Sequence, residues 1–184
     1  MHRRTQELLG HLDRSRRVLL DALATIPADR RDARPAAGGW SAANVLSHLA
    51  RTEGQVAAFL QRALRTALAD DALPPAADES SVLASIDEDR LLDRTTRLVA
   101  PDFAAPDPEM PADRALAELE RARERARQVL LAGDGRDTSS LRRAHHVLGE
   151  LTFEQWLAFV GLHMQRHAAQ LVELGERLAA DDRA

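Results

Sequence analysis

Two histidines near the C-terminus, His163 and His167, have the spacing of residues that act together. Residues four apart share one face of an α-helix, so both imidazoles can point at the same place. A third histidine, His48, closes a segment of helical character that begins at Trp40. Three imidazole nitrogens from two helices would cap one side of a metal ion and leave its other side open to water or a substrate. The spacing therefore predicts a metal site with room for chemistry.

Other interpretations of these histidines can be compared with the sequence. A zinc protease of the His-Glu-x-x-His type needs a glutamate as general base directly after the first histidine, and that position is Met164. A ferritin-like di-iron centre needs Glu-x-x-His, and no glutamate in the sequence has a histidine three residues later. A packed cluster of core histidines is the remaining alternative. Metal binding is favoured over it because burying unpaired polar groups costs about 1–3 kcal/mol each.

The elements that would position these histidines are helical. Apolar residues recur at helical spacing over residues 3–26, 41–69, 111–132 and 152–179, and no alternating strand pattern is evident. Pro27 ends the first segment, Ser41 is a predicted N-cap of the second, and Thr152 begins a capping box for the last. The charged residues of the third segment, which include Arg123, are expected to form a solvated face.

A long crossover separates the second and third helical segments. Residues 70–111 contain six of the eight prolines and one short helical candidate, residues 86–99. Four helices of these lengths without strands predict an all-α fold, a four-helix bundle.

Composition limits the function classes. With 184 residues, 45% of them hydrophobic, the chain is expected to form one domain over residues 1–184. The absence of cysteine excludes disulfides and a cysteine nucleophile, and favours a cytoplasmic location. No stretch approaches the ~18 apolar residues of a membrane span. A net charge of −4 and 3% aromatic residues argue against nucleic-acid binding.

Three stretches of the sequence resemble, in order, the DinB/YfiT-like superfamily. They are residues 38–53, which include Gly38-Gly39-Trp40-Ser41 and His48, then residues 145–152, and then residues 163–170. The resemblance covers most of the chain. It implies an up-down-down-up bundle, with the long crossover between the second and third helices, and often a homodimer.

The resemblance also implies a ligand set and a chemistry. His48, His163 and His167 match the family's metal-binding histidines, and zinc or nickel is the divalent metal expected on them. Better characterised relatives are transferases and isomerases that use a low-molecular-weight thiol such as bacillithiol, mycothiol or glutathione. Two positions depart from the pattern, since Met164 stands where an acidic residue is common and His146 where proline is common.

A metal held by three neutral imidazoles supports three functions. Its charge would lower the pKa of a bound thiol below the free value of ~8.5, which produces a nucleophile for conjugation to a small electrophile. The same field would lower the pKa of bound water to ~7, which would support hydrolysis. In the third alternative the protein is not catalytic and the metal stabilises the helices. We expect the thiol S-transferase, with the other two functions as alternatives.

Four residues near the histidines each have two interpretations. Asn44 could reach the open side of the metal or cap its helix. Glu53 lies about 140° around the helix from His48, which favours pairing with another helix or an arginine over orienting that ligand. His145 could line the mouth of the site or bond to the backbone, and Arg166 could bind an anionic thiol or form an exposed salt bridge.

Overall fold

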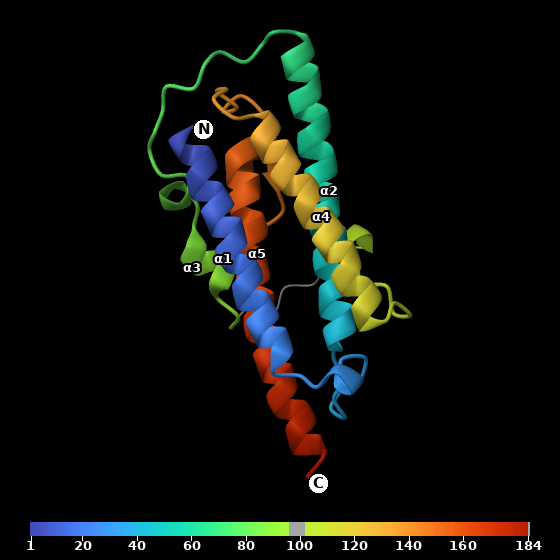
Figure 1. Ribbon diagram of the computed structural model, residues 1–184. Coiled ribbons are helices and arrows are strands. Elements are labelled where there is room, and N and C mark those ends of the chain that lie inside the picture. Colours follow the sequence, from blue (N-terminus) through green and yellow to red (C-terminus); the bar gives the residue numbers. More distant parts are fainter. Residues whose placement is uncertain (96–101, 184) are drawn as a thin grey trace.

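The structure is a computed structural model that describes residues 1–95 and 102–183. These residues form five α-helices (Figure 1), two β-strands and three short 3-10 helices, which are named η1–η3 below. In chain order the elements are α1 (Arg3–Ala24), η1 (Ala28–Arg30), α2 (Ala42–Ala69), η2 (Leu83–Ser85), α3 (Glu88–Leu92), η3 (Asp102–Ala104), α4 (Ala112–Ala132), β1 (Arg142–His145), β2 (Gly149–Thr152) and α5 (Phe153–Asp181). The four long helices expected from the periodicity are all present.

The long helices pack as two pairs. The most extensive contacts are those between α2 and α4 and between α1 and α5, and α2 also packs against α5. In Figure 1, α1 and α5 run from the top of the view to the bottom, whereas α2 and α4 run upward. The chain between α2 and α4 therefore has to travel the length of the molecule, which agrees with the expected long crossover.

Capping boxes begin the two helices that carry the histidines. The Oγ of Ser41 accepts a hydrogen bond from the backbone N–H of Asn44, and the Oδ1 of Asn44 accepts one from the N–H of Ser41. Thr152 and Gln155 form the same reciprocal pair at the start of α5. Such pairs satisfy two of the unpaired N–H groups at a helix start, and so define where α2 and α5 begin.

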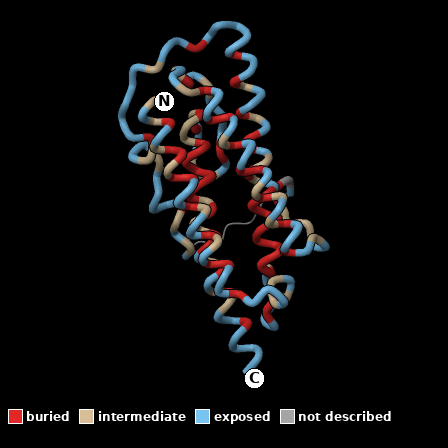
Figure 2. Tube along the Cα trace, in the orientation of Figure 1, coloured by how far each residue is buried: buried red, intermediate tan, exposed pale blue. Residues whose placement is uncertain are grey.

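Buried residues recur along all four long helices (Figure 2). They form two apolar clusters, one including Leu60 and Leu157 and the other including Leu46 and Leu171. On α5 the two clusters meet around His163, between Leu162 and Met164. Buried polar groups are found at the same level on the other helices: His11 and Ser15 on α1, His48 and Glu53 on α2, and Arg123 on α4. A polar layer thus crosses the helices between the two apolar clusters.

Two expectations need correction. β1 and β2 form an antiparallel hairpin, with Arg142 opposite Thr152 and His145 opposite Gly149, although no strand was expected. Each strand has four residues and is largely exposed, so it leaves no alternation of buried and exposed positions in the sequence. The helix expected over residues 86–99 is limited to α3 within the described chain, and residues 96–99 lie outside the described residues.

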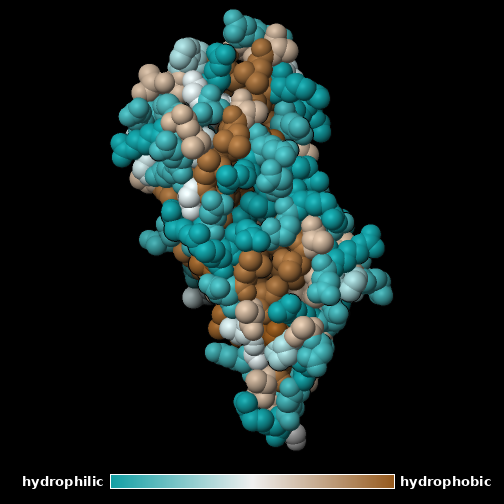
Figure 3. Space-filling view, viewed as in Figure 1, coloured by the Kyte–Doolittle hydropathy of each residue, from teal (hydrophilic) through white to brown (hydrophobic). Residues whose placement is uncertain are grey.

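Hydrophilic residues cover most of the face shown in Figure 3. Hydrophobic residues are visible mainly along the middle of this face, between α1 and α4. None of the helices within the described residues is long and apolar enough to cross a membrane.

Candidate metal centre

Helices α2 and α5 bring three histidine side chains together. His163 Nε2 lies 3.2 Å from His48 Nε2 and 3.1 Å from His167 Nε2. One nitrogen from each ring can be chosen so that all three lie within 4.8 Å of one another. The three histidines expected from the sequence therefore converge on one point and could hold a metal ion.

Hydrogen bonds fix the proton position on two of the rings. His48 Nδ1 lies 2.6 Å from the carbonyl oxygen of Ala104, and His167 Nδ1 lies 2.7 Å from Oε1 of Gln170. The main-chain carbonyl of Ala104 can only accept, so Nδ1 of His48 must donate its proton, and Nδ1 of His167 donates to the Gln170 oxygen that faces it. In the neutral ring the other nitrogen then carries a lone pair. Both Nε2 lone pairs face the third histidine.

The third ring cannot satisfy both of these lone pairs. If His163 carries its proton on Nε2, that N–H can be directed well at only one of the two neighbouring nitrogens. If it carries the proton on Nδ1, three lone pairs converge with no hydrogen between them. A cation at this point would satisfy all three nitrogens at once. Hydrogen bonds from the far nitrogen to a carbonyl group, as His48 and His167 make here, are the usual support of metal-binding histidines.

Burial keeps the three imidazoles neutral. His48 and His167 are buried and His163 is half-buried. Burial lowers the pKa of His48, and it lowers that of His167 to about 3. The pKa of His163 falls well below its ordinary value because of burial and the nearby rings of His167 and His48. At neutral pH all three rings therefore have the unprotonated nitrogen that a metal ion requires.

Aromatic rings and the crossover enclose the histidines. The Trp40 ring lies 5.0 Å from that of His48 and 6.2 Å from that of His167, between ring centroids. On the other side Phe159 stacks on His163 at 5.2 Å. Ala104, which accepts from His48, belongs to η3 in the crossover. The site is thus bounded by aromatic side chains and by a segment of the crossover that is distant in sequence from both histidine-bearing helices.

A buried ion pair, Arg123 with Glu53, lies next to the histidines in the polar layer. Arg123 of α4 donates from Nε to Glu53 Oε1 of α2 at 2.5 Å, and from Nη1 to the carbonyl oxygen of Leu12 in α1 at 2.8 Å. Its Nη2 lies 3.2 Å from the sulfur of Met164 in α5. The expected pairing of Glu53 with an arginine is confirmed. The expectation that the charged residues of α4 are solvated is wrong for Arg123, which is buried between helices.

Glu53 is paired with Arg123 in this layer. Burial raises the pKa of its carboxyl, and the charge and hydrogen bonds of Arg123 oppose that rise. Because one guanidinium contacts groups on all of the other long helices, the pair fixes their positions at the level of the histidines.

Three further candidates have structural partners. Asn44 caps α2 and is not directed at the site by any hydrogen bond among the described residues. Nδ1 of His145 accepts from the backbone N–H groups of Val147 and Leu148 at 3.1 and 3.2 Å, which holds the hairpin turn. Burial, together with His146, lowers the pKa of His145 to about 4. Arg166 donates to the carbonyl oxygens of Leu91 and Asp93, and so attaches the end of α3 to α5.

Sequence reasoning missed the groups that orient the ligands. Gln170 lies three residues after His167, a spacing that places it on the same helix face, and this signal was available. The carbonyl of Ala104 has no sequence signal, because any residue type would provide the same acceptor. The contact of Trp40 with two of the histidines also depends on how the loop before α2 folds back.

Comparison with known proteins identifies a family for the chain. Neither the curated proteins nor the solved structures give a significant match to the chain. The family model of the DinB superfamily matches residues 11–171, which include all three histidines and most of the sequence. The chain therefore belongs to the DinB superfamily.

Proposed function

We propose that the protein binds one divalent metal ion, zinc or nickel, on His48, His163 and His167, and uses it to transfer a small thiol to an electrophile. The observation that carries the proposal is the convergence of three neutral imidazole nitrogens without enough protons to satisfy one another. We also propose that the four long helices form an up-down-down-up bundle, as the pairing of α1 with α5 and α2 with α4 supports.

The spacing of the nitrogens fits a small divalent ion. Two nitrogens bound at about 2.0–2.1 Å in tetrahedral geometry lie about 3.3 Å apart. The two Nε2 separations that involve His163, 3.2 and 3.1 Å, are close to this value, and the nitrogens of all three rings lie within 4.8 Å of one another. The donor set contains no carboxylate or sulfur, and imidazole nitrogens suit zinc and nickel. The residues therefore fit the metal that the superfamily implies.

The proposed reaction needs little more from the protein than this site. When bound, a cation on three neutral imidazoles would lower the pKa of an added thiol well below ~8.5. In the transfer a sulfur–carbon bond forms, the bond from carbon to the leaving group breaks, and the thiol proton passes to solvent. The chain has no cysteine to compete for the electrophile. Trp40 and Phe159 would shield two sides of the histidine cluster from water.

Metal content tests the site independently of any activity. We would purify the untagged protein, the His163→Ala variant and the His146→Ala variant, in which an exposed histidine outside the site is removed. We expect close to one zinc or nickel ion per chain in the first and last proteins and none in His163→Ala. Equal metal content in all three proteins, or no metal in any of them after zinc and nickel are added, would reject the site.

Activity then separates the three functions. The metal-loaded protein is mixed with glutathione, bacillithiol or mycothiol and with 1-chloro-2,4-dinitrobenzene, and product is followed by absorbance. Metal-dependent conjugation that is lost in His163→Ala supports the transferase. Turnover of an ester without thiol would favour the hydrolase, and a metal that only raises the melting temperature would favour the non-catalytic alternative. The homodimer expected from the resemblance remains a prediction, which sedimentation velocity can test.

A further inference from the structure

The histidine that ends β1, His145, has one ring nitrogen occupied and the other available to donate. Its Nδ1 accepts hydrogen bonds from the backbone N–H groups of Val147 and Leu148 at 3.1 and 3.2 Å. A nitrogen that accepts carries no proton, so in the neutral ring the proton is on Nε2. The hairpin turn therefore makes Nε2 of His145 an N–H donor and fixes its position.

This donor has no acceptor within residues 1–95 and 102–183. It is nevertheless in contact with solvent, because the unpaired side-chain atoms that are sealed from solvent in this part of the chain belong to Arg4, Thr52 and Arg94. His145 as a whole is buried, so the small surface that it keeps includes this nitrogen. A rigidly held ring thus presents one accessible hydrogen-bond donor.

The donor is uncharged. Two backbone N–H groups face Nδ1 and oppose a second proton there, and burial, with a smaller effect of His146, lowers the pKa of His145 to about 4. The rings of Phe159 and Trp156 lie beside it, with centroids 4.5 and 5.1 Å away. Among these rings a carboxylate would lose its hydration without gaining an opposite charge. The surroundings therefore favour an uncharged oxygen, such as that of a carbonyl or nitro group.

Phe159 places His145 beside the candidate metal centre. The centroid of the Phe159 ring lies 4.5 Å from that of His145 and 5.2 Å from that of His163. The two imidazoles therefore cannot be farther apart than these two separations combined. His163 is half-buried, whereas His48 and His167 are buried. The centre is thus most open at the histidine that shares Phe159 with His145.

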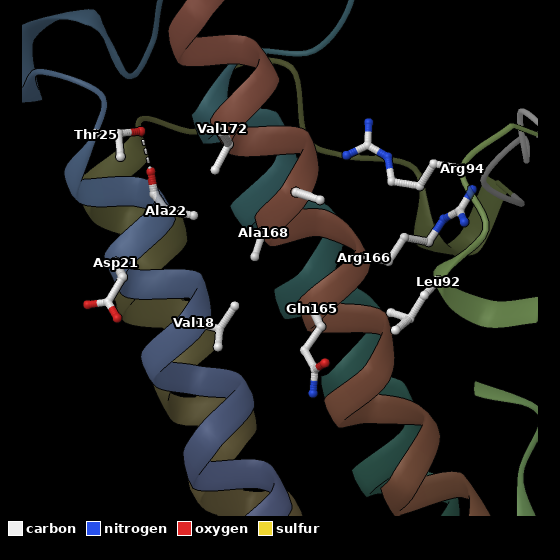
Figure 4. A pocket seen from close by; sticks show the side chains of 11 residues that line it. Val18, Asp21, Ala22, Thr25, Leu92, Arg94, Gln165, Arg166, Ala168 and Val172 are labelled. Carbon is white, nitrogen blue, oxygen red and sulfur yellow. Dashed lines mark hydrogen bonds between the residues drawn. The ribbon is translucent and has the colours of Figure 1, made fainter. Parts of the chain in front are cut away.

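The pocket shown in Figure 4 lies on a different face of α5. It runs between α1 and α5, and none of the three histidines lines it. Val172, which lines the pocket, follows His163 by nine residues and so lies on the opposite side of the helix. Phe159 precedes His163 by four residues and shares its face. A group that holds a substrate against the metal centre therefore belongs on the face where His145 packs.

We propose that His145 donates from Nε2 to the activating oxygen of the electrophile, and so selects electrophiles whose reactive carbon is conjugated to an uncharged carbonyl or nitro group. This inference rests on the proposed transferase function and names its substrate class. As the thiolate sulfur bonds to carbon, an electron pair moves onto the conjugated oxygen, and the N–H of His145 stabilises this charge without giving up its proton. In a substitution the pair then returns, and the leaving group departs with the electrons of its bond to carbon. Enzymes use a neutral imidazole N–H in this way to polarise a carbonyl group.

Two substitutions separate the roles of the two ring nitrogens. Asparagine places an amide oxygen near the position of Nδ1, so His145→Asn keeps an acceptor for the turn and loses the Nε2 donor. Glutamine places an amide N–H near the position of Nε2, so His145→Gln keeps the donor and loses the acceptor. If His145 only holds the turn, His145→Gln should be the more damaging change. The proposal expects the reverse for catalysis. The control is His146→Ala, which removes the exposed neighbouring imidazole.

Initial rates of the metal-loaded proteins are compared for two electrophiles. 1-Chloro-2,4-dinitrobenzene carries acceptor oxygens, and benzyl chloride has none. With chlorodinitrobenzene we expect kcat/KM to fall about tenfold or more in His145→Asn and less than about threefold in His145→Gln. With benzyl chloride, and in His146→Ala, the change should be less than about twofold. Equal losses with both electrophiles, or a larger loss in His145→Gln than in His145→Asn, would overturn the proposal.

A binding measurement makes the test independent of turnover. Acetophenone and α-methylstyrene have the same shape and differ in the one acceptor oxygen. Each is titrated into zinc-loaded protein labelled with ¹⁵N in its histidines, and the Nε2 resonance of His145 is followed by NMR. We expect acetophenone to shift this resonance, to bind about threefold or more tightly than α-methylstyrene, and to lose that preference in His145→Asn.

The two experiments distinguish failure of this inference from failure of the proposed function. Acetophenone that leaves the His145 resonance unchanged, or a preference that persists in His145→Asn, would overturn the inference even if the protein transfers thiols. A preference that depends on His145, without conjugation of any thiol, would support the oxygen-binding role of His145 and reject the transferase.

Discussion

Replacing Gly161 by alanine should destabilise the protein, although the same change stabilises most helices. Gly161 lies inside α5, and a Cβ atom there would be 2.1 Å from Nε2 and 2.4 Å from Cδ2 of His11. His11 is buried on α1, and its Nε2 lies 3.0 Å from the carbonyl oxygen of Ala158. The glycine therefore provides the space in which the His11 ring reaches α5.

The size of the loss in stability follows from one favourable and two unfavourable contributions. In an ordinary helix interior, alanine is more stable than glycine by about 1 kcal/mol. Here the new methyl group must displace a packed ring, at a cost of about 1–3 kcal/mol for overpacking. Losing the hydrogen bond to Ala158 leaves buried polar groups unsatisfied, at a further cost of about 1–3 kcal/mol. We expect a net loss of about 3 kcal/mol in the free energy of unfolding.

Urea denaturation followed by circular dichroism measures this loss. The matched control is Gly10→Ala in α1. Apart from the backbone of its own helix, the new Cβ would approach only the flexible end of Arg14 among the described residues, at 3.2 Å, so we expect a gain of about 0.5–1 kcal/mol. In the double variant His11→Ala with Gly161→Ala, the methyl group has room, and the combined loss should be smaller than the sum of the two single losses. A Gly161→Ala protein as stable as the natural sequence would refute the reasoning.

Three other predictions concern the polar layer. Gln170→Ala removes the acceptor that orients His167, and should weaken zinc binding about 10–100-fold in a competition titration. The metal-free fold should stay intact. An unchanged zinc affinity would contradict the proton position assigned to His167. In the metal-free protein, burial lowers the pKa of His167 from 6.5 to about 3, so its contribution to stability is complete above pH 6.5 and is lost as the pH falls toward 3. Below pH 6.5, that histidine alone should make the free energy of unfolding fall by up to about 1.4 kcal/mol for each pH unit of acidification. Urea midpoints that stay constant from pH 7.5 to 4.5 would contradict this prediction. Arg123→Met leaves Glu53 buried without a cation and should lower the free energy of unfolding by about 3–5 kcal/mol, as measured by thermal unfolding. Adding Glu53→Leu should restore most of that loss in the double variant. Additive losses would mean that the broken pair is not the cause.

The sequence predicts the long helices and the histidine set because both depend on local spacing. Ser41 and Thr152 each act through a residue three positions away, so their caps can be read without knowledge of the fold. His163 and His167 likewise share a face because of helix geometry alone. His48 required a separate inference, since nothing local specifies that α2 packs against α5.

The parts that could not be predicted depend on contacts between distant residues. Arg123 lies in a run of charged residues that looks uniformly solvated, and only the packing of α4 against α2 selects this one for burial. The acceptor for His48 is a main-chain carbonyl 56 residues away, which no side chain identifies. The hairpin is short and exposed, so it lacks the burial pattern by which strands are recognised.

The balance of hydrogen-bond donors and acceptors is what separates a metal centre from a packed cluster of histidines. A packed cluster is stable when each ring nitrogen finds a partner of the opposite kind. Here the Ala104 carbonyl and the Gln170 side chain use the protons of His48 and His167 on the far side of each ring, and so turn two lone pairs toward His163. A cluster selected only for packing has no reason to orient its rings in this way, because one lone pair always remains without a proton. The same orientation is the one in which each ring supports a cation. The far-side hydrogen bonds, more than the number of histidines, are therefore the structural argument for a metal in this member of the DinB superfamily.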